Sequence, residues 1–388
     1  MAGRIGKTRF DIGVVGGGPA GAVAAYVLAG AGARVALIVR DRPHSAFAVG
    51  ETIPAETRQL LNGLGLDCLS TDLHLPSAGT MARWGSDVAH CREAILNPFG
   101  CGWHLDRPLF ERQLMDAAVR SGAVLIEHCA RIETKSKPAG WEFQIDRAGQ
   151  QIWVSSDYAV DCTGRAARLA VDAGARRQIH DKLIAIWCVA EESSAQSDPD
   201  QRIYLESAPD GWFYSVRIPN RRRVLAYFTD GDLCDARLRS AVNFKDYVAK
   251  TFHLQAGADG PHCHFVAGPF RVNAASARLV RVYGERWIAV GDAAQSFDPL
   301  SSQGIITAIV GGHNAAAALV AIHSSDSCVL EKLQADLDAR YAAYLSERLT
   351  YYRAEQRWVA RPFWQRRHGL LTGSRASHVG RSDQPSPL

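Results

Sequence analysis

Six residues near the start of the chain have the types and spacing that bind the pyrophosphate of a dinucleotide. In the turn from Gly16 to Gly21, Gly16 allows a tight bend and Gly18 lets the backbone approach a phosphate. Gly21 lets a helix pack closely on a strand, and Pro19 and Ala20 begin that helix, whose free N–H groups attract anions. At this point NAD, NADP and FAD all fit, and a glycine-rich turn without a ligand is the alternative.

The elements around this turn are those that a dinucleotide site needs. Residues 10–16 form a short apolar run typical of a strand, an alanine-rich helical segment follows the turn, and residues 34–39 predict a second strand. An acidic residue that holds ribose usually closes this second strand. Asp41 lies one or two positions late for that role, and Arg40 could contact a phosphate instead.

A second motif far along the chain narrows the choice of cofactor. A short apolar run ends at Gly291-Asp292, and a loop with Pro299 leads to Gly304 and a long alanine-rich helix. This arrangement resembles the GD motif of FAD-dependent aromatic hydroxylases and flavin-dependent halogenases. The resemblance implies that Asp292 holds the ribityl chain of FAD and that the segment from Pro299 to Ile305 runs beside the isoalloxazine ring. The dipole of the helix from Gly304 would then point at the flavin.

Three further motifs resemble the same superfamily and occur in its order. Residues 158–170, with Gly164 at the turn, resemble its DATG or DASG turn, and residues 49–66 resemble the GESLLP segment of the halogenase-like branch. Residues 102–123 resemble a helix in which Arg107 would contact the cofactor. FAD is therefore the predicted cofactor, and the closest resemblance is to the halogenase-like branch that includes tryptophan-modifying flavoproteins of quinone-cofactor maturation.

The resemblance also implies a fold and a division of the chain. The expected class is α/β, with a Rossmann-type FAD-binding domain, an inserted antiparallel β-sheet substrate domain and a C-terminal helical segment. The expected boundaries are 8–80, 105–175 and 275–325 for FAD binding, 81–104 and 176–274 for the substrate sheet, 326–368 for C-terminal helices and 369–388 for a flexible tail.

The residue pattern of the inserted region predicts a β-sheet rich in aromatic side chains. Residues 202–233 alternate apolar and polar side chains around a turn at 219–222, which indicates an antiparallel hairpin. Residues 183–192 and 79–86 are expected to join it. Each aromatic side chain here could line a substrate pocket or pack in the core under the sheet. The candidates are Trp84, Trp103, Trp187, Trp212 and Tyr214.

Glu51 and His104 are the candidates for proton transfer, because both lie in segments that the resemblance places near the cofactor. A structural role for His104 is the alternative. A flavin hydroperoxide needs little help from a base, so an enzyme without a dedicated base also fits.

The source of electrons is constrained by what the sequence lacks. The chain has no second glycine fingerprint and no Cys-x-x-Cys pair, which argues against a separate NAD(P)H domain and against a disulfide reductase. Two routes remain, transient docking of NAD(P)H and reduced flavin from a partner reductase. In the oxygenases that the chain resembles, the reduced flavin forms a C4a-hydroperoxide with oxygen.

Two features of the sequence favour hydroxylation over halogenation. Tryptophan halogenases use a lysine after the GE segment, yet no lysine occurs between Lys7 and Lys135. Their WxWxIP signature is also altered, with Tyr214 in place of the second tryptophan and Ile218-Pro219 two places late. The predicted reaction is hydroxylation of an aromatic substrate, an indole or a peptidyl tryptophan. A halogenase, a geranylgeranyl-reductase-like isoprenoid reductase and a flavin-binding scaffold without turnover are the alternatives.

Composition limits the partners. The net charge of +4 over 388 residues gives no case for nucleic acid, and the N-terminus has no signal-peptide pattern. No uninterrupted apolar run is long enough for a membrane span, so a cytoplasmic protein is expected. A metal site at residues 262–264 lacks a second ligand cluster and is not predicted. Residues 330–358 predict a long amphipathic helix that either packs on the core or covers a partner protein.

Overall fold

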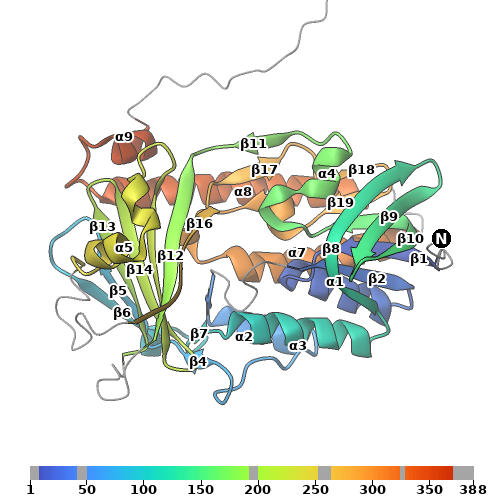
Figure 1. The fold of residues 1–388 in the computed structure, drawn as a ribbon, viewed down its shortest axis with the longest axis horizontal. Coiled ribbons are helices and arrows are strands. Elements are labelled where there is room, and N and C mark those ends of the chain that lie inside the picture. Colours follow the sequence, from blue (N-terminus) through green and yellow to red (C-terminus); the bar gives the residue numbers. More distant parts are fainter. Residues whose placement is uncertain (1–7, 42–49, 192–199, 252–263, 324–327, 370–388) are drawn as a thin grey trace, which may run out of the picture.

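A computed structural model describes residues 8–41, 50–191, 200–251, 264–323 and 328–369. Two large sheets lie side by side, joined by long helices that run along the molecule (Figure 1). The expected tail falls outside the described residues except for Gly369, as do His262 and Cys263 of the metal candidate.

The first sheet carries the glycine turn. Its parallel part pairs β1 with both β2 and β10, β2 with β8, and β10 with β19, while β9 and β18 are antiparallel additions. The carboxyl ends of the parallel strands therefore meet at one edge, where ligands of such sheets bind. The strands are β1 (Thr8–Val15), β2 (Val35–Arg40), β8 (Val124–Lys137), β9 (Gly140–Arg147), β10 (Gln150–Asp161), β18 (Tyr283–Gly284) and β19 (Trp287–Ala289).

Helices cover this sheet. The first helix, α1 (Pro19–Gly30), is apolar and small on nearly every side and packs against α3 (Arg107–Arg120) and α7 (Gly304–His323). By length and composition α7 could cross a membrane between Gly304 and Ile322. In the fold it packs between α1 and α8 (Val329–Ala354), which is the position of a core helix.

The second sheet is the inserted one, and its strand order is β16-β12-β15-β14-β13-β5-β6. The predicted hairpin is confirmed, because β14 and β15 pair antiparallel around a turn at 219–221. The expected additions are confirmed as well: β12 pairs with β15, and β5 joins β13 in parallel. The strands are β5 (Gly79–Arg83), β6 (His90–Glu93), β12 (Leu183–Glu191), β13 (Arg202–Ala208), β14 (Gly211–Ile218), β15 (Arg222–Asp230) and β16 (His264–Asn273).

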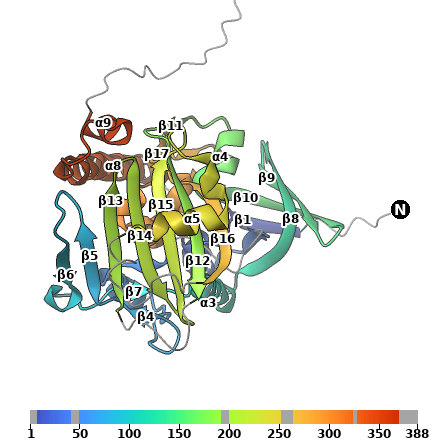
Figure 2. The same ribbon diagram turned by 60° about the vertical axis from the view of Figure 1, so that its left-hand side comes forward.

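The central strands β12, β14 and β15 of this second sheet carry buried side chains on both faces. One face packs against α5 (Ala241–Val248), which crosses the strands in Figure 2, through Phe244 and Tyr227. The other face packs Trp187 and Trp212 against α9 (Pro362–His368) and the end of α8. Successive side chains along these strands therefore point to two apolar faces, rather than to one apolar face and one solvent-exposed face.

Short elements connect the two sheets. A three-stranded sheet in the order β3-β7-β4 lies under α7 and α2, and a second one in the order β11-β17-β20 lies under α8. The long helix expected at residues 330–358 is α8, which ends at Ala354, and α9 follows within the segment 326–368 where helices were expected. The remaining elements are α2 (Glu56–Gly63), α4 (Arg168–Asp172), β3 (Thr52–Ile53), β4 (Leu75–Pro76), β7 (Trp103–His104), β11 (Arg177–Ile179), β17 (Ala277–Leu279), β20 (Gln295–Ser296), η1 (Ala94–Leu96), η2 (Gly164–Ala166), η3 (Ala236–Arg239), η4 (Gly291–Ala293) and η5 (Pro299–Ser301).

Candidate active site

The glycine turn between β1 and α1 has no room for side chains. A Cβ on Gly16 would lie 2.1 Å from the carbonyl oxygen of Cys162, and one on Gly21 would lie 1.8 Å from that of Gly16. Gly16 also has a φ of +119°, which disfavours any other residue. The N-cap of α1 is Gly18, so no side chain caps the helix, and its first turn holds no acid. The free N–H groups there suit a pyrophosphate.

The Gly291 turn packs on the same place from the other end of the sequence. A Cβ on Gly291 would lie 2.9 Å from Cβ of Ala20, and one on Gly312 of α7 would lie 2.4 Å from the carbonyl oxygen of Ala20. At the start of α7, a Cβ on Gly304 would meet no atom within 4 Å, so the space before this helix is open. We call Gly16, Gly18, Gly21 and Gly291 the nucleotide cradle.

The turn after β10 is held by a buried carboxylate. Asp161 accepts hydrogen bonds from the backbone N–H of Thr163 at 2.9 Å and of Ala170 at 2.8 Å. Burial raises its pKa, against these hydrogen bonds. Gly164 follows with a φ of +69°. Asp161 therefore shapes the turn on which Gly16 rests and supports the cradle from behind.

Arg165 joins three segments that form the edge of the site. Its Nε lies 3.4 Å from Oδ2 of Asp292, and its two Nη atoms donate to the carbonyl oxygens of Ala275 at 2.6 Å and Phe297 at 2.8 Å. Asp292 is thereby oriented while its side chain stays 35% exposed, within reach of a ligand. Sequence reasoning did not assign a role to Arg165, whose position beside the turn was the only available signal.

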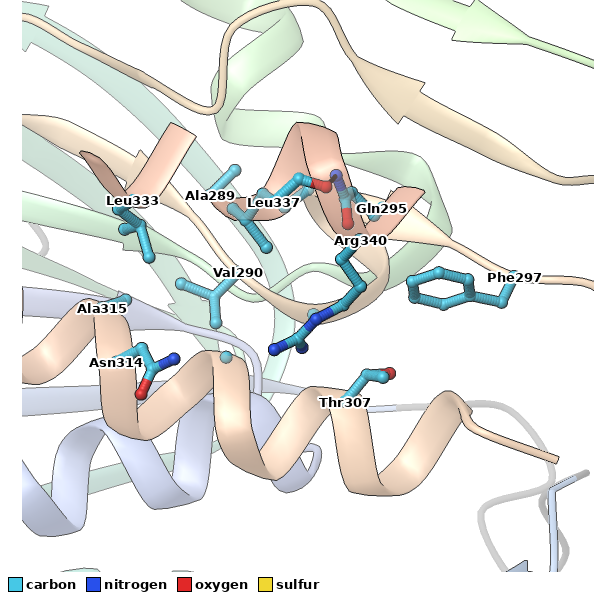
Figure 3. Close-up of a pocket in the computed structure, with 13 residues that line it drawn as sticks. Ala289, Val290, Gln295, Phe297, Thr307, Asn314, Ala315, Leu333, Leu337 and Arg340 are labelled. Carbon is cyan, nitrogen blue, oxygen red and sulfur yellow. Dashed lines mark hydrogen bonds between the residues drawn. The ribbon is translucent and has the colours of Figure 1, made fainter. Parts of the chain in front are cut away.

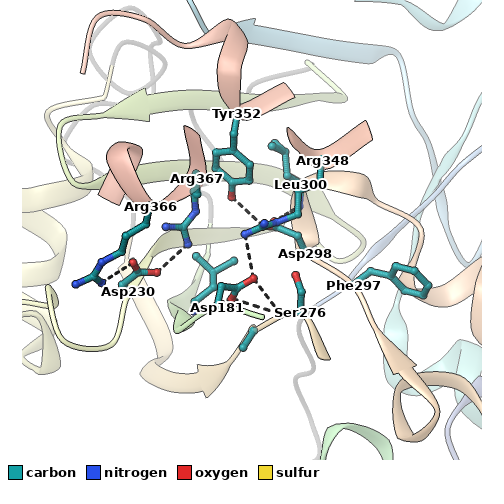
Figure 4. Close-up of polar contacts among 12 residues, drawn as sticks. Asp181, Asp230, Ser276, Phe297, Asp298, Leu300, Arg348, Tyr352, Arg366 and Arg367 are labelled. Atoms are coloured by element: carbon teal, nitrogen blue, oxygen red, sulfur yellow. Dashed lines mark hydrogen bonds and ion pairs between the residues drawn. The ribbon is translucent and has the colours of Figure 1, made fainter. Parts of the chain in front are cut away.

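The loop that follows the Gly291 turn is anchored to α8 through buried polar side chains (Figure 4). Arg348 donates from Nε to Asp298 at 3.0 Å and from Nη2 to Asp181 at 2.9 Å. The hydroxyl of Tyr352 donates to Asp298 at 2.9 Å, and the N–H of Asp298 donates to the hydroxyl of Tyr344 at 2.7 Å. We call these five residues the α8 network. It fixes the segment from Pro299 to Gly304 and was not foreseen from the sequence.

Glu51 occupies the opposite side of the site, where the segment before β3 meets the inserted sheet. The residue is 2% exposed, and neither carboxyl oxygen has a hydrogen-bond partner on another side chain among the described residues. Burial raises its pKa to about 7, although the backbone N–H of Glu51 itself, then the charge of Arg107 and then the backbone of Gly50 oppose the shift. It borders a cleft of about 350 Å³, named the Glu51 cleft, which is lined by Glu51, Leu105, Asp106, Arg107, Pro108, Val189, Ile218, Pro219, Arg222 and Val224.

Arg107 begins α3 and has partners of its own. Its Nε donates to Glu111 at 2.8 Å, and its Nη1 donates to the carbonyl oxygen of Gly50 at 2.5 Å. It therefore holds the backbone next to Glu51. Whether it also touches a cofactor stays a prediction.

His104 and Trp103 form β7, which connects the Glu51 segment to α7. His104 is fully buried, and its ring nitrogens have no hydrogen-bond partner among the described residues. Burial and then the charge of Arg223 lower its pKa to about 4, against the backbone carbonyl of Arg217, so the ring is neutral at pH 7. Trp103 packs with Ile305 of α7 in one cluster. The N-terminus of α7 and the Glu51 segment are thus neighbours.

The five aromatic side chains that are candidates for the substrate pocket lie in different environments in the fold. Trp212 stacks on Phe228 with ring centroids 3.9 Å apart and donates to Tyr352 at 3.1 Å, and Trp84 donates to the carbonyl oxygen of Tyr351 at 2.9 Å. These are the contacts of core side chains beside the C-terminal helices. The indole N–H groups of Trp187 and Trp103 have no partner among the described residues.

Tyr214 interacts electrostatically with Glu51, which borders the Glu51 cleft. Burial and then the charge of Glu51 raise its pKa, while a side-chain hydrogen bond with Thr52 opposes the shift. Of the aromatic candidates, Tyr214 is therefore the one whose electrostatics are coupled to Glu51.

Arg40 and Asp41 lie exposed at the end of β2, beside the glycine turn. Asp41 Oδ1 lies 3.6 Å from Nδ1 of His128, and its N–H donates to the carbonyl oxygen of Cys129 at 2.9 Å. The neighbouring Val39 would touch a Cβ on Gly17 at 2.8 Å, so this strand end is close enough for a ribose contact, which stays a prediction.

A second cavity of about 440 Å³ lies between α7, α8 and β19 (Figure 3). Its walls are mainly apolar, and Arg340 extends into it from α8 toward Asn314 and Thr307. Gly291 borders this cavity as well, so the Gly291 turn has the nucleotide cradle on one side and this cavity on another. Among the described residues, no cluster of three metal-ligating side chains occurs.

Comparison with known proteins shows which family this chain matches. The family model described as "FAD binding domain" matches residues 9–340. A putative FAD-dependent oxidoreductase, LodB of Marinomonas mediterranea, is 29% identical over 376 residues, which cover 95% of this chain and 99% of that protein. A digeranylgeranylglycerophospholipid reductase of Methanopyrus kandleri is 28% identical over 339 residues, 82% of each chain.

Two solved structures share the fold. The flavin-dependent halogenase CmlS superposes with a TM-score of 0.79 at 23% identity, covering 93% of this chain and 68% of that chain. The peptidyl tryptophan dihydroxylase QhpG superposes with a TM-score of 0.75 at 22% identity, covering 97% and 82%. The expected fold class, an FAD-binding α/β unit with an inserted sheet and C-terminal helices, is confirmed.

Proposed function

This chain belongs to the FAD binding domain family, and from that premise we propose that it is a monooxygenase that hydroxylates the indole ring of a tryptophan in a peptide or protein. The observation that carries the proposal is the Glu51 cleft, in which a buried carboxyl group meets apolar side chains between the start of α3 and the inserted sheet. Apolar walls beside a small number of polar groups suit a flat aromatic ring.

FAD fits the residues that surround the cradle. The uncapped N-terminus of α1 would hold the pyrophosphate, and the partly exposed Asp292, oriented by Arg165, would hold the ribityl hydroxyls. The open N-terminus of α7 at Gly304 would face the flavin ring. Asp41, at the end of β2, is proposed for the ribose.

The bound cofactor would supply the redox chemistry, activating molecular oxygen and transferring one atom to the substrate. The chain's own residues do the rest. The α8 network keeps the 299–304 loop in one conformation, and the two apolar faces of the inserted sheet exclude water from the reacting ring. Glu51 is the side chain placed to exchange a proton or a hydrogen bond with the substrate.

The substrate class rests on two supports. QhpG, whose fold is shared over 97% of this chain, is by its description a peptidyl tryptophan dihydroxylase essential for tryptophylquinone cofactor biogenesis. Halogenation is disfavoured because no lysine occurs from residue 8 to residue 134. A flavin-dependent halogenase remains the second candidate, since CmlS has this fold.

Two electron sources suit this chain, NAD(P)H that docks transiently and reduced flavin from a partner reductase. Anaerobic stopped-flow mixing of the FAD-loaded protein with NADH or NADPH separates them. Direct reduction at a rate above turnover supports docking, and its absence supports the partner.

The test of the function is oxygen insertion. The FAD-loaded protein is reduced, mixed with isotopically labelled oxygen and a tryptophan-containing peptide, and the peptide is analysed by mass spectrometry. One or more labelled oxygen atoms on tryptophan is the expected result. A halogenated peptide when bromide is present would establish the second candidate instead, and saturation of an isoprenoid chain without oxygen uptake would overturn both.

A further inference from the structure

We propose that Glu51 accepts the hydrogen bond of the substrate's indole N–H, so that the enzyme selects a neutral aromatic ring that carries such a donor. This inference rests on the proposed function and specifies which edge of the substrate is recognised, and by which residue.

The first support is the unpaired state of the carboxyl group. Both Glu51 oxygens are buried without a side-chain partner among the described residues, and only backbone N–H groups lie near them, while most buried polar groups in proteins are fully paired. The same segment is otherwise ordered by hydrogen bonds: the N–H of Leu105 donates to the Glu51 carbonyl at 2.7 Å, and Arg107 donates to Gly50. The side chain alone is left open, and it borders the cleft.

The second support is the shape and polarity of the cleft. Leu105, Val189, Ile218 and Val224 give the cleft apolar walls beside its charged residues. A flat ring would pack against these side chains. Its polar edge would then face Glu51.

The third support is the charge around Glu51. Arg107 is already paired with Glu111, and Arg222 lines the cleft with an interaction of its own. A ligand carboxylate would therefore meet Glu51 rather than a free cation. The ring of a tryptophan within a peptide carries no such charge, whereas the free amino acid does.

The remaining ionisable groups near Glu51 leave its role intact. His104, whose backbone pairs with Thr52, is held neutral by burial, and the Tyr214 hydroxyl stays protonated because its pKa is raised. Asp106 caps α3 by accepting from the N–H of Leu109 at 3.1 Å. Glu51 is thus the group whose charge changes near neutral pH, with its pKa at about 7.

A ligand without the donor would leave the buried carboxyl unpaired. Sites built to hydrogen-bond a ligand N–H reject the analogue that lacks it, by roughly 10⁴-fold in the strongest cases. Because a carboxylate accepts more strongly than a carboxylic acid, the preference should grow as the pH rises through about 7.

The experiment is calorimetric titration of the FAD-loaded protein with N-acetyltryptophanamide and with its indole-N-methylated analogue. We expect the wild type to bind the parent at least about tenfold more tightly, and more so at about pH 8 than at about pH 6. Glu51→Gln keeps an acceptor oxygen and part of the preference, Glu51→Leu reduces it to less than about twofold, and Glu331→Gln on exposed α8 surface leaves it unchanged.

Equal affinity for the two probes in the wild type overturns the inference, as does a tenfold preference that survives Glu51→Leu, or no binding of either probe. Wild-type data decide even if the leucine variant does not fold. Flavin content is measured by absorbance on the same samples. A flavin-loaded, oxygen-inserting enzyme with equal affinities refutes only the role of Glu51, whereas a protein that cannot hold FAD refutes the proposed function.

Discussion

Two buried carboxyl groups on opposite sides of the site, those of Asp298 and Glu51, differ in the hydrogen-bond donors around them. Asp298 is 1% exposed and is surrounded by donors from Arg348, Tyr352 and the N–H of Leu300. Glu51 is 2% exposed and has no side-chain donor among the described residues. Equal burial with opposite pairing separates a group that maintains the structure from one that is available to a ligand.

The chemistry of each environment explains the contrast. A buried carboxyl group with a guanidinium and a hydroxyl around it has its hydrogen-bonding capacity satisfied, and removing one partner leaves the other buried and unpaired. A buried carboxyl without a paired side chain takes up a proton more readily, and for Glu51 burial outweighs the nearby backbone N–H groups and Arg107, so its pKa rises to about 7. The first arrangement resists change, and the second responds to pH and to ligands.

The largest expected effect is loss of the α8 network. Arg348→Ala leaves Asp298 and Asp181 buried without their shared cation, and it should lower the free energy of unfolding by about 3–5 kcal/mol. Urea denaturation followed by circular dichroism measures this. Arg340→Ala, on the same helix, serves as the matched control and should cost less than about 1 kcal/mol. Equal losses in the two variants would remove the distinction drawn for Asp298.

The second prediction concerns the nucleotide cradle, which is proposed to bind FAD. Gly16→Ala places a methyl group 2.1 Å from the Cys162 carbonyl oxygen at a φ of +119°. Affinity for FAD should fall at least a hundredfold, about 3 kcal/mol, in a fluorescence titration of the apoprotein. Gly30→Ala at the end of α1 meets no atom within 4 Å and should bind FAD as the wild type does.

The third prediction tests Glu51 through the pH dependence of stability. Its pKa is raised from 4.5 unfolded to about 7 folded, so the folded state binds more protons between these values and wild-type stability falls as the pH rises through them. Glu51→Gln removes this loss. The stability of the variant relative to the wild type should therefore grow by about 2–3 kcal/mol from about pH 5 to about pH 8. Urea melts of both apoproteins measure it, and a constant difference contradicts an unpaired Glu51.

The smallest effects concern the two acids proposed to contact the nucleotide. Asp292→Asn should weaken FAD binding by about ten- to a hundredfold, because Arg165 orients this side chain toward the ligand. Asp41→Asn, at an exposed strand end, should weaken it by less than about threefold. The reverse order would place the FAD ribose contact, rather than the ribityl contact, at the centre of recognition.

The sequence allowed the cradle to be predicted because its signals are local. A glycine turn between a strand and a helix dictates its own geometry, and the turns at Gly164 and Gly291 follow strands whose parallel pairing brings their ends together. The hairpin of β14 and β15 could likewise be predicted, from the alternation of apolar and polar residues around its turn.

The α8 network was out of reach for the opposite reason. Arg348 pairs with Asp298 across 50 residues and with Asp181 across 167, and nothing near any of them signals the partner. The pocket aromatics were ambiguous because both faces of the inserted sheet are apolar, so alternation does not tell which face meets a ligand. Glu51 was a candidate by position, but its unpaired state is a property of the fold.

The most direct test of the contrast is an infrared titration of the protonated-carboxyl stretch in the wild type and in Glu51→Gln. A band that is present at about pH 5, vanishes through about pH 7 and is missing from the variant is the expected result. A wild-type spectrum with no such band at about pH 5, or one that the variant retains, would contradict the claim that Glu51 is the unpaired, ligand-ready acid of this site.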